Sequence, residues 1–538
     1  MKRPDPIPPG PGQESVWDYP RPAIAEPTGA HILIEHRGQR IAETRRAVRV
    51  LETSHPPQYY IPPDDIASGV LEPAPGRSLC EWKGQARYWS VVVGGERLDR
   101  VGWSYPDPAP GFRQLTDHVA FYAAPFDRIT LDGDPVEPQP GEFYGGWVTS
   151  KVVGPFKGKQ QPKPPVGEKR LRRCRWDPAV SLTIPHDWPS GVYLGRLTTL
   201  PDKANTPYWQ SYVIFIVRDD RPADFLFQCS DNTWQAYNRW PDNFSLYTDP
   251  RGSHALDVAV SFDRPYAKYS QIFERPLSTG SGEFLLWEYP LAYWMEKHGY
   301  DVTYCSNSDC LDAGQITRCN TFISVGHDEY WDVLQYHAVK KAIGAGTNAM
   351  WLCGNSVFAV SPFSEAKRVI TRDGIYSGLT DEEINESISV FTKEWRRSGP
   401  DESDIIGARS IVPFNGGGDW TCTKPGHWIF EGTGMKKGDA IPGLVGWEHH
   451  GAPADKSGLE VVAEGPVWRG GTTPAHWTAT LFPGPKKNIV FNAATIWWPQ
   501  GLASPPGHIL PWSHYSRPHG PDRRVQQITQ NLFGTTLQ

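Results

Sequence analysis

The sequence predicts a multidomain protein of the α+β class, with an all-β N-terminal region followed by a C-terminal α/β region. At 538 residues, the chain is too long to fold around a single hydrophobic core. Its first part contains short strand-like runs separated by glycine and proline turns, which is typical of an all-β domain. From Asp224 onward, strand-like and helical runs alternate, which indicates βαβ units around a mostly parallel sheet.

The N-terminal region begins with a proline-rich stretch, residues 1–28, which we expect to form a disordered or surface-lying arm. The residues that follow show strand-like runs separated by turn signals, such as the glycine pair at 94–95. We therefore predict a single all-β domain over residues 29–160. Its expected strands lie at 31–35, 41–44, 86–93, 118–124 and 143–153.

The middle of the chain, residues 161–222, is predicted to hold a linker and a short β-sandwich-like segment. A stretch at 154–173 is rich in lysine, arginine, proline and glycine, as expected of a linker or an exposed loop. The run from Tyr212 to Val217 is aromatic or β-branched throughout, so we expect a buried strand there. Strands are expected at 179–184, 192–197 and 208–217.

The α/β region is predicted to span residues 223–538. Because helices connect most of its expected strands, we expect those strands to lie parallel. The part after residue 374, which includes the glycine run at 415–418, is expected to be loop-rich. Strands are expected at 225–228, 301–304, 321–325, 349–352 and 487–492, and helices at 288–298, 332–345 and 523–532.

Composition limits the classes of partner. A net charge of -6 and a pI of about 6.3 give no support for a nucleic acid or an anionic membrane as partner. No apolar run is long enough to span a bilayer, and no secretion signal precedes the first domain, so we expect a cytoplasmic protein. The partner that remains is a small-molecule substrate, and the sequence leaves a homo-oligomer open.

Several common site motifs are missing from the sequence. The eight cysteines are scattered and form no CxxC pair, which argues against a zinc knuckle and favours reduced thiols. The chain contains no P-loop, no HExxH and no GxSxG motif. These absences argue against a P-loop nucleotide site, a zinc protease of that type and the commonest serine hydrolases.

The leading candidate site is the stretch 322–331, in which an apolar run ends at Gly326 and five chemically rich residues follow. In an open α/β sheet, ligands bind at the carboxyl ends of the strands, where this turn would lie. His327 or Tyr330 is therefore a candidate general base or metal ligand. The alternative is structural: Asp328 caps the helix expected after it, Trp331 packs and His327 bonds locally.

A second candidate lies at the end of the next expected strand, at Cys353. A strand that ends in Cys-Gly could expose a thiol on a sharp turn, and His327 could lower the pKa of that thiol. The alternative is that Cys353 is a small core residue. Asn355 could offer its amide to a substrate or to the backbone.

Three further groups are weaker candidates. The stretch 228–240, with Trp234 and Tyr237, could form a wall for a substrate or a loop that satisfies its own polar groups. Neighbouring His449 and His450 face opposite sides of a strand, so this pair alone would not complete a metal site. In the β domain, the expected arrangement is a solvated rim, although a cleft could bring together Glu52, His55, Cys80 and Lys83.

Two parts of the chain resemble known families. Residues 31–158 resemble a bacterial domain of unknown function with a small β-tent fold, through the stretches 51–65, 80–84 and 139–147. Residues 175–535 resemble the large subunit of N,N-dimethylformamidase and its relatives. The stretches that carry this second resemblance are 188–193, 233–237, 326–331, 354–355 and 427–434.

The second resemblance implies a glutamine-amidotransferase-like α/β domain and an amide hydrolase with a mononuclear iron held by two tyrosines and one glutamate. Tyr330 matches the tyrosine of the family's His-x-Glu-Tyr-Trp turn, and Tyr289 is the best candidate for the second phenol. Glu394 is the first candidate for the glutamate, and Glu448 is the second.

The function predicted on this basis is metal-assisted hydrolysis of a small amide or another C–N bond. One alternative is a thiol-dependent amidohydrolase that uses Cys353 with His327. Another is a non-catalytic binding protein, whose α/β crevice would be lined by Trp234, Tyr237 and Trp331. His327 would move the proton to the leaving amine in the metal-assisted reaction.

Overall fold

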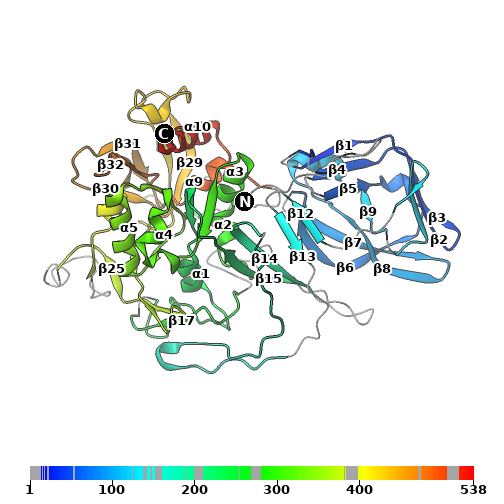
Figure 1. Ribbon diagram of the computed structural model, residues 1–538, viewed down its shortest axis with the longest axis horizontal. Coiled ribbons are helices and arrows are strands. Elements are labelled where there is room, and N and C mark those ends of the chain that lie inside the picture. The colour runs from blue at the N-terminus through cyan, green and yellow to red at the C-terminus, as the bar shows by residue number, and fades with distance from the viewer. Residues whose placement is uncertain are drawn as a thin grey trace.

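The fold is described from a computed structural model of the chain (Figure 1). Glu394, a predicted metal ligand, lies outside the described residues. The structure describes residues 14, 16, 18–20 and 23–537, except 53–54, 81, 124, 137–141, 146–147, 152–159, 187, 199–209, 254, 268–279, 381, 383–397, 471–473 and 506–519.

An all-β domain forms the N-terminal end of the molecule, as predicted (Figure 1). Its strands make three antiparallel sheets, with the orders β1-β4-β5, β11-β10-β2-β3 and β6-β7-β8-β9. Burial alternates along β2, so Ile32 and Ile34 reach the core. The bounds are β1 Ile24–Pro27, β2 Ile32–His36, β3 Gln39–Thr44, β4 Val48–Glu52, β5 His55–Tyr60, β6 Leu71–Cys80, β7 Gly84–Val93, β8 Glu96–Ser104, β9 Val119–Phe121, β10 Arg128–Leu131 and β11 Asp134–Pro135.

Two features of this domain differ from expectation. β1 lies inside the residues expected to form an arm, but it pairs with β4 in the first sheet. Lys83 is buried rather than part of a solvated rim, and its ammonium group forms an ion pair with Glu52. Buried ammonium groups need such a partner because burial in an apolar site destabilises an isolated charge.

Two small antiparallel sheets follow the β domain. The first pairs β12 (Glu142–Gly145) with β13 (Val148–Lys151), and the second pairs β14 (Gly191–Thr198) with β15 (Gln210–Val217). The predicted strand at 179–184 is not formed, so a two-stranded sheet takes the place of the expected sandwich-like segment. β15 is also not the buried strand we expected, because a two-stranded sheet leaves a face uncovered and Val213 is 52% exposed.

A seven-stranded sheet forms the centre of the C-terminal region, with the order β18-β16-β19-β21-β33-β32-β31. Its first five strands are parallel, as predicted, and the last two are antiparallel to their neighbours. The bounds of its strands are β16 Ala223–Gln228, β18 Val302–Cys305, β19 Cys319–Gly326, β21 Asn348–Cys353, β31 Glu460–Val467, β32 Ala475–Pro483 and β33 Ile489–Asn492.

Helices cover both faces of this sheet, so its central strands are buried on both sides. α3 and α10 pack on one face with Phe225 and Ile323, whereas α4 and α5 pack on the other with Leu226 and Phe322. The predicted helices at 288–298, 332–345 and 523–532 correspond to α3, α5 and α10. The bounds are α1 Asp231–Tyr237, α2 Phe284–Trp287, α3 Tyr289–Lys297, α4 Ala313–Thr317, α5 Val333–Ala345, α8 Ser403–Ile406, α9 Trp498–Leu502 and α10 Arg523–Thr536.

The part after residue 374 contains more strands than the loop-rich stretch we expected. The glycine run at 415–418 leads into β28, which pairs with β29 and delivers Glu448 directly after that hairpin. The remaining strands of the whole C-terminal region are β17 Ala259–Ser261, β20 Tyr330–Trp331, β22 Ala359–Val360, β23 Phe363–Ser364, β24 Val369–Thr371, β25 Gly374–Tyr376, β26 Ser398–Gly399, β27 Ala408–Ser410, β28 Gly416–Thr421, β29 Ala440–Trp447 and β30 His450–Pro453.

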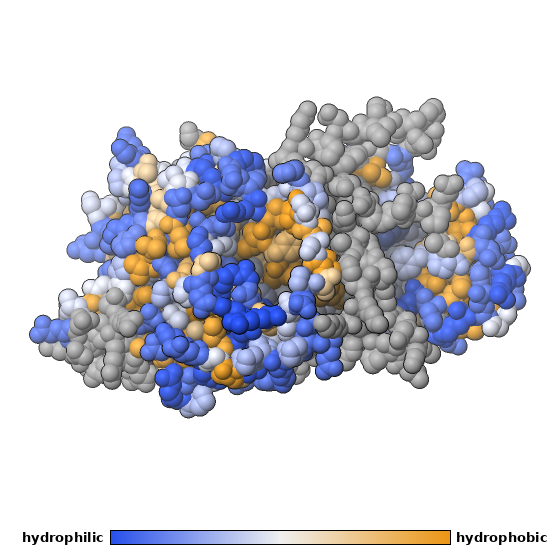
Figure 2. Space-filling model, turned by 60° about the horizontal axis from the view of Figure 1, so that its bottom comes forward, coloured by the Kyte–Doolittle hydropathy of each residue, from blue (hydrophilic) through white to orange (hydrophobic). Residues whose placement is uncertain are grey.

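The two large parts of the molecule touch at an aromatic contact. The ring of Trp82 in the β domain lies 5.6 Å from that of Tyr293 on α3. On the face drawn in Figure 2, hydrophobic side chains gather around a hollow near the middle of the molecule. Among the helices that the structure describes, none is long and apolar enough to cross a membrane.

Candidate active site and metal centre

The predicted turn after β19 is built around Gly326. This residue has a φ of +66°, and a Cβ here would lie 2.7 Å from the Cβ of Trp287, so only glycine fits without strain. The turn buries the side chains of the next residues instead of exposing them. The structural alternative for Asp328, a cap on the following helix, is not realised, because Asp332 accepts the N–H of Leu334 at the start of α5.

A second glycine brings Glu448 to the same end of the sheet. A Cβ on Gly354, at the end of β21, would overlap the carbonyl oxygen of Glu448, so the two chain segments can meet only at a glycine. Asn355 follows and donates its amide to Glu448 Oε2 at 3.3 Å. The carboxylate therefore enters the site from the loop after β29 and is held there by Asn355.

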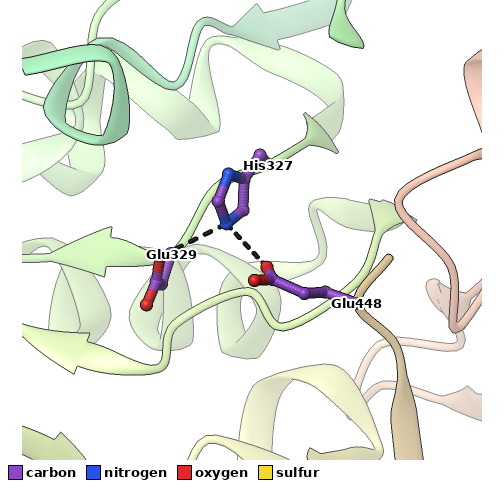
Figure 3. Close-up of side chains that lie close together, drawn as sticks. All are labelled: His327, Glu329 and Glu448. Carbon is purple, nitrogen blue, oxygen red and sulfur yellow. Dashed lines mark ion pairs between the residues drawn. The ribbon is translucent and has the colours of Figure 1, made fainter. Parts of the chain in front are cut away.

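One imidazole and three carboxylates meet in this buried site. His327 Nε2 lies 2.6 Å from Glu448 Oε2 and 3.2 Å from Glu329 Oε2 (Figure 3). On its other side, His327 Nδ1 lies 3.6 Å from Glu283 Oε2. His327, Glu329 and Glu448 each offer a ligand atom within 4.8 Å of the others, so together they could hold a metal ion.

A layer of phenols covers the Glu329 carboxylate. The hydroxyl of Tyr237, at the end of α1, donates to Glu329 Oε2 at 2.7 Å, and that of Tyr247 donates to Oε1 at 3.1 Å. These two hydroxyls lie 2.9 Å apart, and Tyr330 donates its own hydroxyl to Tyr247. Each carboxylate oxygen of Glu329 thus accepts a hydrogen bond from a different phenol, and the two phenols come from separate segments of the chain.

Charge and burial set the protonation of these groups. Burial would lower the pKa of His327, but the carboxylates around it, Glu448 first, raise that pKa well above its ordinary value. Burial raises the pKa of Glu448, so the two groups hold a proton between them. Burial and the nearby Glu329 also raise the pKa values of Tyr237 and Tyr247, which keeps both phenols protonated.

A buried cation lies behind the phenol layer. The guanidinium group of Arg372 stands 5.1 Å from the ring centre of Tyr247 and donates to the carbonyl oxygens of Ser253 and Ala255. Its charge lowers the pKa values of Tyr247 and Tyr330, although the larger effect of burial still raises both. Arg372 therefore favours negative charge on the phenol oxygens.

The other predicted site residues lie in different surroundings. Trp234 donates its indole N–H to Glu288 Oε1 at 2.7 Å, and Trp331 is fully buried with its ring 5.6 Å from that of Trp351. Tyr289 packs near Phe284 and Tyr293, with ring centres 6.1 Å and 6.3 Å away. The site therefore brings together His327, Tyr330, Tyr237, Asn355 and Glu448 from the predicted set.

Cys353 lies in the core on the α5 side of the sheet, with its sulfur 3.5 Å from the hydroxyl of Ser324. Burial raises the pKa of this thiol to about 12. At neutral pH the thiol is therefore protonated, and it is the thiolate that attacks a carbonyl.

Three members of the cluster were not among the predicted site residues: Tyr247, Glu329 and Glu283. Glu329 stands in the predicted turn, and its position two residues after His327 was the signal that could have identified it. Tyr247 and Glu283 lie in stretches without a motif. Only the tertiary fold shows that they reach the turn.

Comparison with family models agrees with both predicted resemblances. The model for "N,N-dimethylformamidase beta subunit-like, C-terminal" matches residues 141–514, well over half of the chain. A second model, for a domain of unknown function (DUF427), matches residues 24–132. Among curated proteins, none matches the sequence.

Proposed function

The chain belongs to the N,N-dimethylformamidase beta subunit-like family, and on that premise we propose that it is an iron-dependent hydrolase of a small amide. A single observation carries the proposal. Two tyrosine hydroxyls, from Tyr237 and Tyr247, meet on the carboxylate of Glu329 in a buried site. Two phenols and one glutamate are the donor set that the sequence resemblance implies.

The residues present fit a cation. Glu283, Glu329 and Glu448 surround His327, so buried acidic groups outnumber the basic group among them. The imidazole contacts all three carboxylates, at 2.6 Å, 3.2 Å and 3.6 Å, and its single positive charge cannot balance them. Burying several acids together destabilises the folded protein unless protons or a cation neutralise them.

The proposed ligands are Tyr237, Tyr247 and Glu329. They differ from the ligands predicted from the sequence, which were Tyr330, Tyr289, and Glu394 or Glu448. Carboxylate and phenolate oxygens are hard donors and suit a hard ion such as ferric iron. Because the phenols are protonated here, loading the site would release protons.

When bound, the metal would supply a Lewis acid that polarises the amide carbonyl. The His327–Glu448 pair would take the proton of the attacking water and deliver it to the leaving amine, because the pair holds an exchangeable proton in contact. Asn355 would position Glu448 through its amide. Tyr330 would position Tyr247 through its hydroxyl.

The thiol mechanism with Cys353 gains no support from the surroundings of this residue, since its thiol is buried and neutral at physiological pH. A binding protein without turnover would use the same buried donors. Kinetic tests separate these alternatives from the proposed hydrolase.

The test is release of amine from small N-alkylated formamides by the iron-loaded protein. We expect turnover by the wild type, loss of turnover with loss of iron in Glu329→Gln, and loss of turnover with iron retained in His327→Gln. Cys353→Ser serves as the matched buried control and should remain active. An active metal-free protein, or an inactive Cys353→Ser that keeps its iron and its fold, would favour the thiol mechanism.

A further inference from the structure

A cavity lies apart from the proposed metal centre. Its volume is about 640 Å³, which is within the usual size range of small-molecule sites. None of the proposed metal ligands is among the residues that line it. The walls are mainly apolar and aromatic, and include Phe358, Ile375, Tyr376, Ile411, Val412 and Phe414.

One carboxyl group lines this apolar cavity. Glu402, just before α8, is 4% exposed, and its Oε2 has no hydrogen-bond partner among the described residues. Backbone N–H groups of Glu402 and Ser410 contact the carboxyl group, yet burial raises its pKa to about 8. A carboxylate in such a site is stabilised by a cation placed beside it.

The other charged side chains of the cavity already have counter-ions. Arg409 forms an ion pair with Asp401 and donates to the carbonyl oxygen of Ser377 at 2.9 Å. His476 lies 2.8 Å from a carboxylate oxygen of Glu464. Glu402 is thus the one lining acid within the described ranges whose charge has no ion pair, and a cationic ligand would complement it.

We propose that this cavity binds a small organic cation, an alkylammonium or arylalkylammonium ion. Its ammonium group would pair with the Glu402 carboxylate, and its apolar substituent would lie against the aromatic walls, where cation–π attraction from Tyr376 and the two phenylalanines adds to burial. Hydrolysis of an N-alkylated amide releases an amine of this class. The binding proposal itself does not depend on that reaction.

The test is isothermal titration calorimetry of the full-length protein with benzylamine hydrochloride at pH 8. We expect saturable binding by the wild type and a loss of about tenfold or more in affinity in Glu402→Gln, which keeps the shape of the side chain and removes its charge. Benzyl alcohol and benzoate, which lack a positive charge, should bind more weakly than the amine.

Two control variants separate this site from its surroundings. Glu464→Gln removes an acid that only neighbours the cavity, and Glu329→Gln alters the proposed metal centre. Both should bind benzylammonium as the wild type does. If Glu329→Gln alone abolished binding, the amine would belong to the metal centre and this proposal would be wrong, whereas the hydrolase proposal would stand.

A second measurement on the wild type covers the case in which Glu402→Gln fails to fold. Because burial raises the pKa of Glu402 to about 8, this carboxyl group is mainly protonated at pH 6.5, where free benzylamine is already the ammonium ion, so binding should release close to one proton there. Titrations in buffers of different ionisation enthalpy measure that number. Binding without proton release at pH 6.5, or an unchanged affinity in folded Glu402→Gln, would overturn the proposal.

Discussion

At the scale of single residues, Glu329 organises the candidate site. Its two oxygens receive the hydroxyls of Tyr237 and Tyr247, and one of them also lies 3.2 Å from His327 Nε2. The sequence predicted the turn, but the ligands predicted from it were Tyr330, Tyr289, and Glu394 or Glu448. The reason is physical: which side chains of a turn point inward depends on backbone angles and on distant segments, such as the loop that carries Tyr247.

Glu402 provides a prediction about stability and pH. Burial raises its pKa to about 8 in the folded protein, well above the ordinary value of a glutamate, so the folded state binds the proton more tightly. This contribution to stability is fully present below the unfolded pKa and is lost as the pH rises through the folded pKa. Glu402→Gln should therefore gain stability relative to the wild type between pH 5 and pH 8, by on the order of 2–5 kcal/mol in total.

Urea unfolding of Glu402→Gln and the wild type across that pH range, without added amine, measures the difference between their free energies of unfolding. Glu464→Gln is the control and should follow the wild type, because the Glu464 side chain is 41% exposed and pairs with His476 near the surface. If the free energies of unfolding of Glu402→Gln and the wild type differed by the same amount from pH 5 to pH 9, the Glu402 carboxyl group would not take up a proton on folding.

At the scale of secondary-structure elements, the parallel strands were predictable because each is a short, fully buried apolar run between turn signals. β28 was not predictable, because its three glycines disfavour a strand. Glycines occur in a strand where another segment of the chain packs close to the backbone, and the sequence does not show that packing. The strands β14 and β15 were predicted, but the exposure of β15 was not, because apolar strand residues do not reveal whether anything covers them.

The contact between β21 and the loop after β29 gives a second prediction. In Gly354→Ala, the new methyl group would meet the carbonyl oxygen of Glu448, so Glu448 must move away from His327. We expect turnover to fall at least tenfold and the free energy of unfolding to drop by about 1–3 kcal/mol, with iron still bound.

Gly344→Ala is the matched control for this substitution, because Gly344 lies inside α5 and nothing stands within 4 Å of its added Cβ. It should be neutral or stabilising by up to about 1 kcal/mol, since alanine favours a helix interior. Turnover in Gly354→Ala equal to that of the wild type would mean that the position of Glu448 is not important for the reaction.

At the scale of the whole molecule, the β domain and the α/β region have separate hydrophobic cores. We therefore expect calorimetric unfolding to show more than one transition. Trp82→Ala, which removes the ring against Tyr293, should lower the midpoint of one transition by a few degrees. Trp468→Ala, at a 48% exposed position, should leave both midpoints in place, and identical shifts in the two variants would argue against the Trp82 contact.

The visible absorption spectrum of the iron-loaded protein tests the central claim most directly. Phenolate ligands of ferric iron give a charge-transfer band, so the wild type should be coloured and contain about one iron per chain, the stoichiometry of a single mononuclear site. Tyr237→Phe and Tyr247→Phe should each weaken or abolish the band, whereas Tyr289→Phe should keep it. A colourless iron-bound wild type, or a band that disappears only in Tyr289→Phe, would contradict the proposed metal centre.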